Sequence, residues 1–226
     1  MNQILYEDKH MILVQKPAGI PSQTSRVSEK DMVSILKNYR AQKAEDSYIA
    51  LIHRLDQPVE GILLAAKTKE AAAELSRQSA AHAMDKYYRA MVYNRNTQPL
   101  IQGENGKLTD YLLKNGKTNC SCVVKEGTKG AKKAVLEYKT LRADDAFADL
   151  SIKLETGRHH QIRVQMAHAG MPLVGDLKYG REEDRSLQGA GKQIALCFVK
   201  IVFLHPKTKK RMEFEIEPEN PAFQLL

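Results

Sequence analysis

The stretch that decides the fold reads His53-Arg54-Leu55-Asp56-Gln57-Pro58-Val59-Glu60-Gly61-Ile62-Leu63-Leu64-Ala65-Ala66. If its first four residues are extended, Arg54 and Asp56 point to one face. His53 and Leu55 then point to the other. The Pro and Gly that follow predict a turn, because Pro fixes one φ angle and Gly permits a positive one. We interpret the stretch as a charged hairpin edge beside a buried strand. The alternative is a surface ion pair at a turn, which contributes little stability.

Composition indicates a globular protein with a basic surface. The 226 residues are 42% hydrophobic and 27% charged, enough for a substantial core in one large domain or two small ones. Lysine and arginine number 35 against 27 acidic residues, and the net charge of +8 favours a polyanionic partner such as nucleic acid. The basic residues are spread along the chain, so a folded positive surface is expected rather than a disordered arm.

Neither the apolar runs nor the cysteines indicate a membrane or secreted protein. No apolar run approaches the length that spans a bilayer, and the N-terminus lacks the pattern of a signal peptide. Cys120, Cys122 and Cys197 leave one thiol unpaired in any disulfide scheme, and they do not have the spacing of a zinc site. We therefore expect a cytoplasmic protein with structural thiols.

Hydrophobic periodicity predicts a strand-rich α+β chain. Helices are expected at 29–40, with Ser28 as N-cap, at 68–82 and at 159–169, where apolar or alanine-rich patterns fit a helix. We expect about nine strands, paired mostly antiparallel. The strongest hairpin signal is Asn115-Gly116.

Asp56 is the first candidate for chemistry. A carboxylate serves as a nucleophile, a base, a metal ligand or half of an ion pair. A metal site would need further ligands at coordinating spacing, and His53 and Glu60 do not supply them. A glycosidase would use two cooperating carboxylates, and Asp56 has no obvious second member. We therefore expect a single catalytic carboxylate and no metal ion.

The second candidate is the donor-rich segment 155–163, where a strand end, a glycine turn and a helix start meet. Such a segment suits a phosphate or a carboxylate, and a solvated helix face is the alternative. Arg163 stands among apolar neighbours, so it is expected to need a buried acid, for which Asp56 is one candidate. His159 and His160 point about 100° apart on a helix and make a poor metal pair.

These segments, with Tyr87-Tyr88, resemble the RluA family of RNA pseudouridine synthases. By themselves, the two tyrosines indicate only a core or cross-strand pair in a strand. The matching motifs stand in family order: Lys16-Pro17-Ala18-Gly19; His53-Arg54-Leu55-Asp56 with Gly61 and Ala66-Lys67; Lys86-Tyr87-Tyr88; Thr156-Gly157-Arg158-His159-His160-Gln161-Ile162-Arg163; and Gly175-Asp176-Leu177-Lys178-Tyr179-Gly180. One departure is Val59-Glu60, where the family commonly has Thr-Ser or similar.

The resemblance implies a pseudouridine synthase fold: a mixed, mostly antiparallel sheet bent over two halves, with a central catalytic cleft. It implies a single catalytic domain over residues 1–226, without the N-terminal S4-like domain of several relatives. The implied enzyme is an isomerase that converts specific uridines in RNA, ribosomal or transfer, to pseudouridine without a cofactor or metal ion. RNA is the expected partner, and we expect a monomer because no exposed apolar helix face stands out.

The resemblance also assigns catalytic roles. Asp56 is the catalytic carboxylate, as a nucleophile or as a base, and Arg163 pairs with it and keeps it ionised. Tyr88 stacks on the base and takes a proton late in the reaction. The expected RNA contacts are Arg54, which fills the space of a flipped base or holds a phosphate, and, for the backbone, Arg158, Lys16 and the basic loop 125–133.

Two alternatives remain. A catalytically silent RNA-binding relative, acting in RNA folding or assembly, shares the charge and the cleft. A hydrolase acting on a nucleoside or glycoside would release a free base or sugar.

Overall fold

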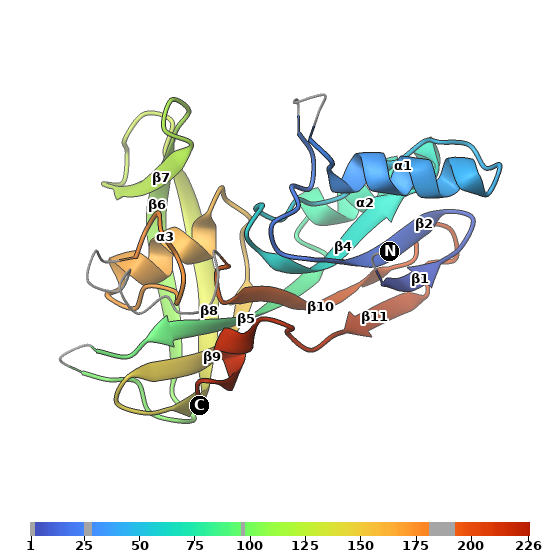
Figure 1. Ribbon diagram of the computed structural model, residues 1–226. Coiled ribbons are helices and arrows are strands. Elements are labelled where there is room, and N and C mark those ends of the chain that lie inside the picture. Colours follow the sequence, from blue (N-terminus) through green and yellow to red (C-terminus); the bar gives the residue numbers. More distant parts are fainter. Residues whose placement is uncertain (1–2, 25–28, 96–97, 181–192) are drawn as a thin grey trace. The chain divides into compact units, whose positions relative to one another are not determined.

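The computed structural model describes residues 3–24, 29–95, 98–180 and 193–226 (Figure 1). The chain separates into two compact units. The first comprises Met1–Asp85 and Phe198–Glu217, and the second comprises Lys86–Cys197 and Pro218–Leu226. Each unit has its own strands and helices and is described by itself.

The strands of the first unit follow the order β1 (Ile4–Glu7), β2 (Met11–Lys16), β4 (Glu60–Ala66), β10 (Leu196–Leu204), with β3 (Ala50–Leu51) also on β4 and β11 (Arg211–Glu215) on β10. β2 and β4 pair antiparallel from Met11 opposite Ala66 to Lys16 opposite Gly61. Every residue of both strands is buried, as the apolar run predicts.

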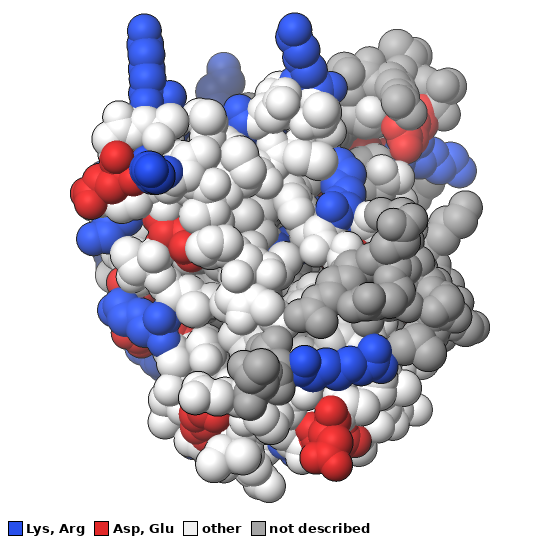
Figure 2. Space-filling model, turned by 90° about the vertical axis from the view of Figure 1, so that its left-hand side faces the viewer, with Lys and Arg blue, Asp and Glu red and all other residues white. Residues whose placement is uncertain are grey.

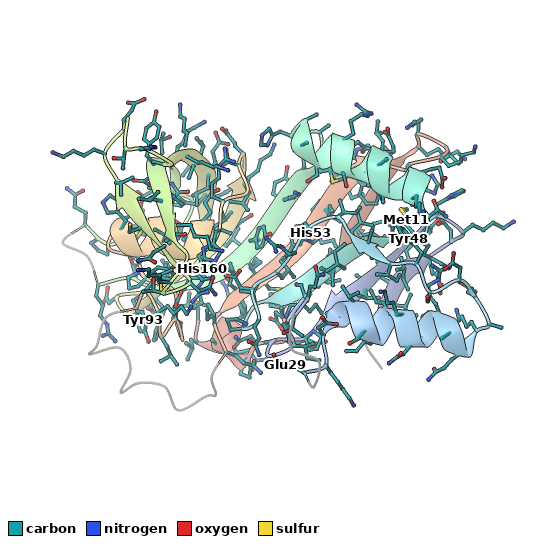
Figure 3. The ribbon with its side chains drawn as sticks, turned by 90° about the horizontal axis from the view of Figure 1, so that it is seen from above. Met11, Glu29, Tyr48, His53, Tyr93 and His160 are labelled. Carbon is teal, nitrogen blue, oxygen red and sulfur yellow. The ribbon has the colours of Figure 1, made fainter. Side chains whose placement is uncertain are left out.

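Two helices lie on the same face of this sheet, α1 (Met32–Gln42) and α2 (Lys69–Ala80) (Figures 1 and 3). Met32 and Leu36 of α1 belong to a buried cluster with residues of β2 and β4. Asp31 is the N-cap of α1, because its side chain accepts a hydrogen bond from the Ser34 N–H (2.7 Å). The helix therefore begins later than predicted, and the expected cap, Ser28, lies outside the described residues.

The strands of the second unit follow the order β5 (Asp85–Tyr93), β9 (Phe147–Leu154), β8 (Lys132–Ala143), β6 (Asn105–Asn115), β7 (Cys120–Val124). Asn115 lies opposite Cys120, so the predicted hairpin at Asn115-Gly116 is confirmed. α3 (Gln161–His168) packs on β6 and β7, with Val164 in a buried cluster with Leu112 and Ala134. A short 3-10 helix (Pro221–Gln224) lies near the end of the chain.

The predicted α+β class and the mostly antiparallel sheet are confirmed, since the β1–β2, β2–β4, β3–β4, β5–β9, β6–β7, β6–β8, β8–β9 and β10–β11 pairs are antiparallel. The described residues form eleven strands rather than about nine. β3 has only two residues, too few to show a sequence period. No helix in the described part of the chain is long and apolar enough to cross a membrane.

Candidate active site

Asp56 lies on a loop of the first unit that leads into β4. Along this loop Arg54 is exposed, Leu55 is buried and Asp56 is half-buried. The Leu55 N–H donates to Ser22 Oγ (2.9 Å), and the Ser22 hydroxyl donates to the Leu55 carbonyl (2.7 Å). The Val59 N–H donates to the Asp56 carbonyl (3.0 Å) and closes the predicted turn. The backbone on both sides of the aspartate is therefore fixed, while its side chain keeps some exposure.

His53, at the start of this loop, contacts β4 and β10 (Figure 3). The Leu64 N–H donates to His53 Nε2 (3.3 Å), and the imidazole meets the Phe198 ring edge-on with centroids 5.0 Å apart. Gly61 has a φ of +132°, and a Cβ at this position would lie 2.5 Å from the Phe198 nitrogen. Glycine is therefore required where β4 passes β10, and this close approach sets the path of the chain just after Asp56.

Lys16 ends β2, and its side chain is fully buried. Its Nζ donates to the carbonyl oxygens of Pro17 (2.8 Å), Ile20 (2.6 Å) and Gln57 (3.2 Å). We call this arrangement the Lys16 clamp. The Gly19 N–H also donates to the Gln57 carbonyl (2.8 Å), so the loop after β2 is fastened to the turn that carries Asp56.

The charge of Lys16 is only partly balanced. Burial lowers the pKa of Lys16 to about 8, against the opposing attraction of Asp56 and Glu60. Because the ammonium group is enclosed by protein carbonyls, the predicted contact of Lys16 with RNA finds no support here. The clamp gives Lys16 a role in holding the Asp56 loop instead.

In the second unit, Arg163 is buried and forms a two-pronged ion pair with Asp176. Nε lies 2.7 Å from Asp176 Oδ2 and Nη2 lies 2.8 Å from Oδ1. The sequence predicted that Arg163 needs a buried acid, and Asp176 is such an acid. The motif from Gly175 to Gly180 contains this residue, but nothing in its spacing marks Asp176 as the partner of an arginine thirteen positions earlier. The pairing of Arg163 with Asp56 stays a prediction.

The start of α3 differs from the predicted helix. His160 has a left-handed backbone with a φ of 54°, so the helix begins at Gln161 rather than at His159. Gln161 Oε1 accepts hydrogen bonds from the Arg158 N–H (2.9 Å) and the Thr156 hydroxyl (2.8 Å). These two bonds fix the glycine turn before the helix. The Arg158 side chain donates from Nε to the carbonyl of Lys133 in β8 (2.9 Å) and is half-buried.

The two histidines before α3 fasten it to β7. Their rings stack with centroids 3.8 Å apart. His159 Nδ1 lies 2.9 Å from Ser121 Oγ, and His160 Nδ1 lies 2.7 Å from the Tyr179 hydroxyl. Burial raises the pKa of Tyr179 to about 12, although the Ser121 N–H donates to its oxygen (2.8 Å) and opposes that rise. Both rings bond to protein groups, and among the described residues no cluster of three or more His, Cys, Asp or Glu could hold a metal ion.

Tyr88 lies in β5, with 8% of its surface exposed, opposite Ile152 of β9. Its neighbour Tyr87 is half-buried and has the ammonium of Lys153 5.7 Å from its ring centroid. The strand predicted at these tyrosines is confirmed. The proposed catalytic role of Tyr88 stays a prediction.

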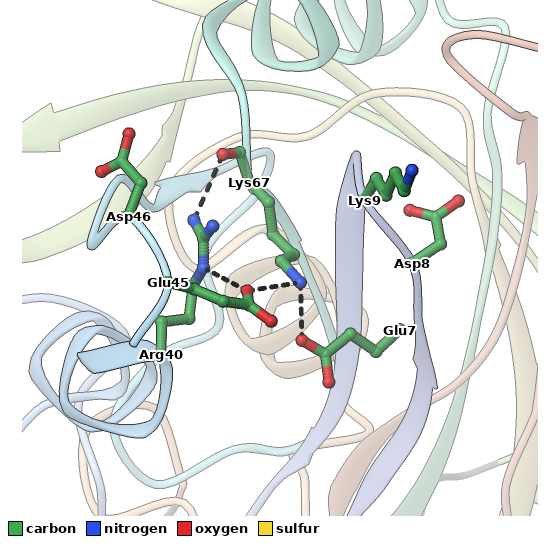
Figure 4. Close-up of a pocket in the computed structure, with 7 residues that line it drawn as sticks. All are labelled: Glu7, Asp8, Lys9, Arg40, Glu45, Asp46 and Lys67. Atoms are coloured by element: carbon green, nitrogen blue, oxygen red, sulfur yellow. Dashed lines mark hydrogen bonds and ion pairs between the residues drawn. The ribbon is translucent and has the colours of Figure 1, made fainter. Parts of the chain in front are cut away.

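A second polar cluster of the first unit lines a surface pocket at the other end of β4 (Figure 4). Lys67 is buried, and its Nζ lies 2.7 Å from Glu7 Oε1 and 3.0 Å from Glu45 Oε2. Arg40 Nε lies 3.2 Å from the same Glu45 oxygen and its Nη1 donates to the Lys67 carbonyl (3.2 Å). These contacts join β1, α1 and the end of β4, so we assign the cluster a structural role.

A family model described as RNA pseudouridylate synthase matches residues 10–168, which include the Asp56 loop, Tyr88 and Arg163. The chain belongs to this family. The predicted membership among the pseudouridine synthases and the predicted enzyme class, an isomerase, are confirmed.

Two curated relatives illustrate the likeness. The ribosomal large subunit pseudouridine synthase D of Zymomonas mobilis is 31% identical over 95% of this chain and 68% of that protein. The tRNA pseudouridine synthase C of Pectobacterium carotovorum is 30% identical over 80% of this chain and 48% of that protein. The chain spans about two thirds of the length of the first relative and about half of the second.

The likeness extends to solved structures. Human RNA pseudouridylate synthase domain containing 1 superposes with a TM-score of 0.74 at 21% identity, over 96% of this chain and 84% of that one. At this identity the match concerns the fold, which is that of the pseudouridine synthases.

Proposed function

We propose that this chain converts uridine within RNA to pseudouridine, with Asp56 as the catalytic carboxylate. The observation that carries the proposal is the Asp56 loop, in a chain of the RNA pseudouridylate synthase family. Ser22 and the Lys16 clamp fix the backbone around the aspartate, and the side chain itself is half-buried. A carboxylate on preorganised backbone is suited to meet a substrate in one geometry.

The reaction rearranges the atoms of one nucleotide. The C1′–N1 bond breaks, the uracil turns and a C1′–C5 bond forms. The C5 hydrogen leaves as a proton and N1 gains one, so the product is an isomer of the substrate. Asp56 starts the glycosidic cleavage as a nucleophile or as a base. Because the reacting atoms are enclosed in a stacked helix, the target nucleotide is flipped out before reaction.

Tyr88 and Arg163 are proposed to act with Asp56. Arg163 is proposed to pair with the carboxylate and keep it ionised, and its fork to Asp176 holds the guanidinium plane in one orientation. Tyr88 is proposed to stack on the base and to accept the C5 proton. Arg54, which is exposed beside Asp56, is proposed to fill the space of the flipped base or to hold a phosphate.

The β6–β7 end of the second unit is the proposed surface for RNA phosphates. Figure 2 shows Lys and Arg side chains projecting along the upper edge of the face on which Figure 1 places β6 and β7. Six exposed lysines come from this part of the chain: Lys114, Lys117, Lys125, Lys129, Lys132 and Lys133. The acid among them, Glu126, accepts a hydrogen bond from the Tyr111 hydroxyl. Such a surface contributes affinity that falls with salt but little sequence selectivity.

The remaining parts of the proposal concern the setting of the reaction. The substrate is ribosomal or transfer RNA, as the names of the relatives suggest. We propose that the protein acts in the cytoplasm as a monomer, and that the two units serve as one catalytic domain with the predicted central cleft.

The deciding experiment is tritium release from RNA labelled at C5 of uridine, because formation of pseudouridine must expel that hydrogen. Wild type should release tritium from ribosomal or transfer RNA, and Asp56→Ala should release none while it still binds RNA. Asp145→Ala, a change of the same kind on an exposed loop, is the matched control and should behave as wild type. Full activity of Asp56→Ala would refute the assignment.

The same experiment separates the alternatives. A silent RNA-binding relative would bind RNA in a salt-dependent way and release no tritium. A hydrolase would release free base or sugar, which chromatography of the reaction mixture detects.

A further inference from the structure

The tip of the β6–β7 hairpin carries Lys114 and Lys117, two lysines of the proposed phosphate surface. β8 pairs with β6 only from Asn105 to Leu112, so among the described strands the hairpin continues beyond Leu112 as two strands. A ribbon of two strands is only marginally stable in water. The orientation of this tip therefore depends on the side chains that contact it.

The hydroxyl of Tyr179 is one of these contacts. Its oxygen accepts the Ser121 N–H of β7 (2.8 Å) and lies 2.7 Å from His160 Nδ1. A hydroxyl can accept one hydrogen bond and donate another at the same time, so both contacts are made together. Because burial raises the pKa of Tyr179 to about 12, the hydroxyl keeps its hydrogen in neutral and mildly basic solution.

Two neighbours of this contact also reach the tip. His159, stacked on His160, has Nδ1 2.9 Å from Ser121 Oγ and Nε2 3.1 Å from Asn119 Oδ1. The ammonium of Lys178 donates to the Asn119 carbonyl (3.1 Å). The tip is therefore fastened both to the start of α3 and to the segment 176–179.

The segment 176–179 also holds Arg163. The Asp176 carboxylate forms the fork to Arg163, and its Oδ1 accepts the N–H groups of Lys178 (3.0 Å) and Tyr179 (3.3 Å). The Arg163 guanidinium carbon lies 5.1 Å from the centroid of the Tyr179 ring. Tyr179 therefore contacts Arg163 with its ring and β7 with its hydroxyl.

We propose that Tyr179 is a positioning residue, which holds the lysines at the tip of the β6–β7 hairpin in a fixed place relative to Arg163. The inference rests on the proposed function, because the hairpin must bind RNA phosphates and Arg163 must take part in turnover. A hairpin that is already fixed loses less conformational freedom when RNA binds. Tyr179 acts through the hairpin and does not need to touch the RNA.

The first test separates binding from turnover. Tyr179→Phe keeps the ring beside Arg163 and loses the hydroxyl, so KM and Kd for RNA should rise about threefold to tenfold, as expected for the loss of one or two phosphate contacts. The rate of tritium release at saturating RNA should stay within about twofold of wild type. Tyr39→Phe, which loses a tyrosine hydroxyl bond to Glu7 in the first unit, is the matched control and should bind RNA as wild type does.

The second test asks whether the hydroxyl acts through the lysines of the tip. Once Lys114 and Lys117 are both changed to Gln, Tyr179→Phe should have almost no further effect on Kd. In a Lys129→Gln background, which alters the loop after β7, it should keep its full effect, because independent changes add. A merely structural role would give the same loss of affinity in every background.

The outcomes distinguish this inference from the proposed function. If wild type binds RNA but releases no tritium, the proposed function fails, while the Kd values still test the link between Tyr179 and the hairpin. Should Tyr179→Phe fail to fold, Asn119→Gly takes its place, because glycine suits the φ of 51° and removes only the contact with His159. A Kd for Tyr179→Phe equal to that of Tyr39→Phe, an equal loss in every lysine background, or no RNA binding by wild type would overturn the inference.

Discussion

Two buried lysines stand at opposite ends of the β2–β4 ladder, and the protein accommodates them differently. Lys16 lies at the end beside the Asp56 loop and donates to carbonyl oxygens of Pro17, Ile20 and Gln57. Lys67 follows the other end of β4, and its ammonium lies between the carboxylates of Glu7 and Glu45 (Figure 4). Both side chains are at least nine-tenths buried.

The difference shows what each kind of partner supplies. Carbonyl oxygens satisfy the donors of an ammonium group, but only an acid balances its charge. Burial therefore lowers the pKa of Lys16 to about 8, which is close to neutral pH. At the other end, burial alone would raise the pKa of Glu7, yet hydrogen bonds from Lys67, Lys43 and Tyr39 lower it to about 2. Glu7, at the structural end of the ladder, therefore stays ionised at neutral pH. Lys16, beside the proposed catalytic residue, loses its proton in mildly basic solution.

The largest effect is expected where a buried, two-pronged ion pair is broken. Arg163 of the second unit extends the comparison, because its fork to Asp176 is almost fully buried. Asp176→Asn should lower the free energy of unfolding by about 3–5 kcal/mol, since it breaks a buried, two-pronged ion pair. Urea unfolding measures this, with Asp145→Asn on an exposed loop as the control. A loss below about 1 kcal/mol, typical of an exposed pair, would contradict the importance of the fork.

Lys67→Met should have a smaller effect, a loss of about 2 kcal/mol in the free energy of unfolding. It leaves Glu7 and Glu45 without their shared cation, but Glu45 is partly exposed and water compensates it. Turnover in the tritium assay should stay near the wild-type rate, because the change is at the far end of the ladder. A Lys67→Met protein that is stable but inactive would contradict the structural role assigned to the Lys67 cluster.

Lys16→Met sharpens the comparison from the other side. It removes the donor of the clamp, but it also removes a buried charge that is poorly balanced, so the net loss in the free energy of unfolding should be only about 1 kcal/mol. The rate of tritium release should fall strongly, because the clamp no longer holds the loop that carries Asp56. If Lys16→Met is less stable than Lys67→Met, measured in the same urea titration, the order proposed here is reversed.

The smallest effect concerns acid pH. Because Glu7 has a folded pKa of about 2, below its ordinary 4.5, its ionisation stabilises the fold above about pH 4.5. That contribution is lost as the pH falls from 4.5 towards 2. Glu7→Gln should flatten this part of the curve of unfolding free energy against pH, and Glu215→Gln should not. Parallel curves for wild type and Glu7→Gln would mean that the partners of Glu7 do not stabilise its ionised form in the folded protein.

Sequence patterns predicted the features that depend on neighbours in the chain. The apolar run 61–66 was predicted to be a buried strand, and this is confirmed. The hairpin at Asn115-Gly116 was confirmed because turn geometry is local. The prediction for the start of α3 was wrong by two residues, because the left-handed backbone of His160 is held by contacts with distant Tyr179.

Partners that lie far apart in the sequence could not be predicted. Lys16 was predicted to contact the RNA backbone, and only the fold shows that it is buried and donates to the carbonyl of Gln57, forty-one positions away. Asp176 was seen as part of a motif but not as the acid that Arg163 requires. The identity of a motif does not show which atoms its side chains meet.

The sequence by itself determined the family, the mostly antiparallel α+β class and Asp56 as the candidate carboxylate, because motif order and local periodicity survive without coordinates. Only the tertiary structure decided how the buried charges are balanced. The cost of burying Lys16 depends on the carbonyl of Gln57 and on the charge of Asp56, and not only on its neighbours in the chain. The fold brings Lys16 to the turn that carries Asp56, and no sequence pattern predicted this contact.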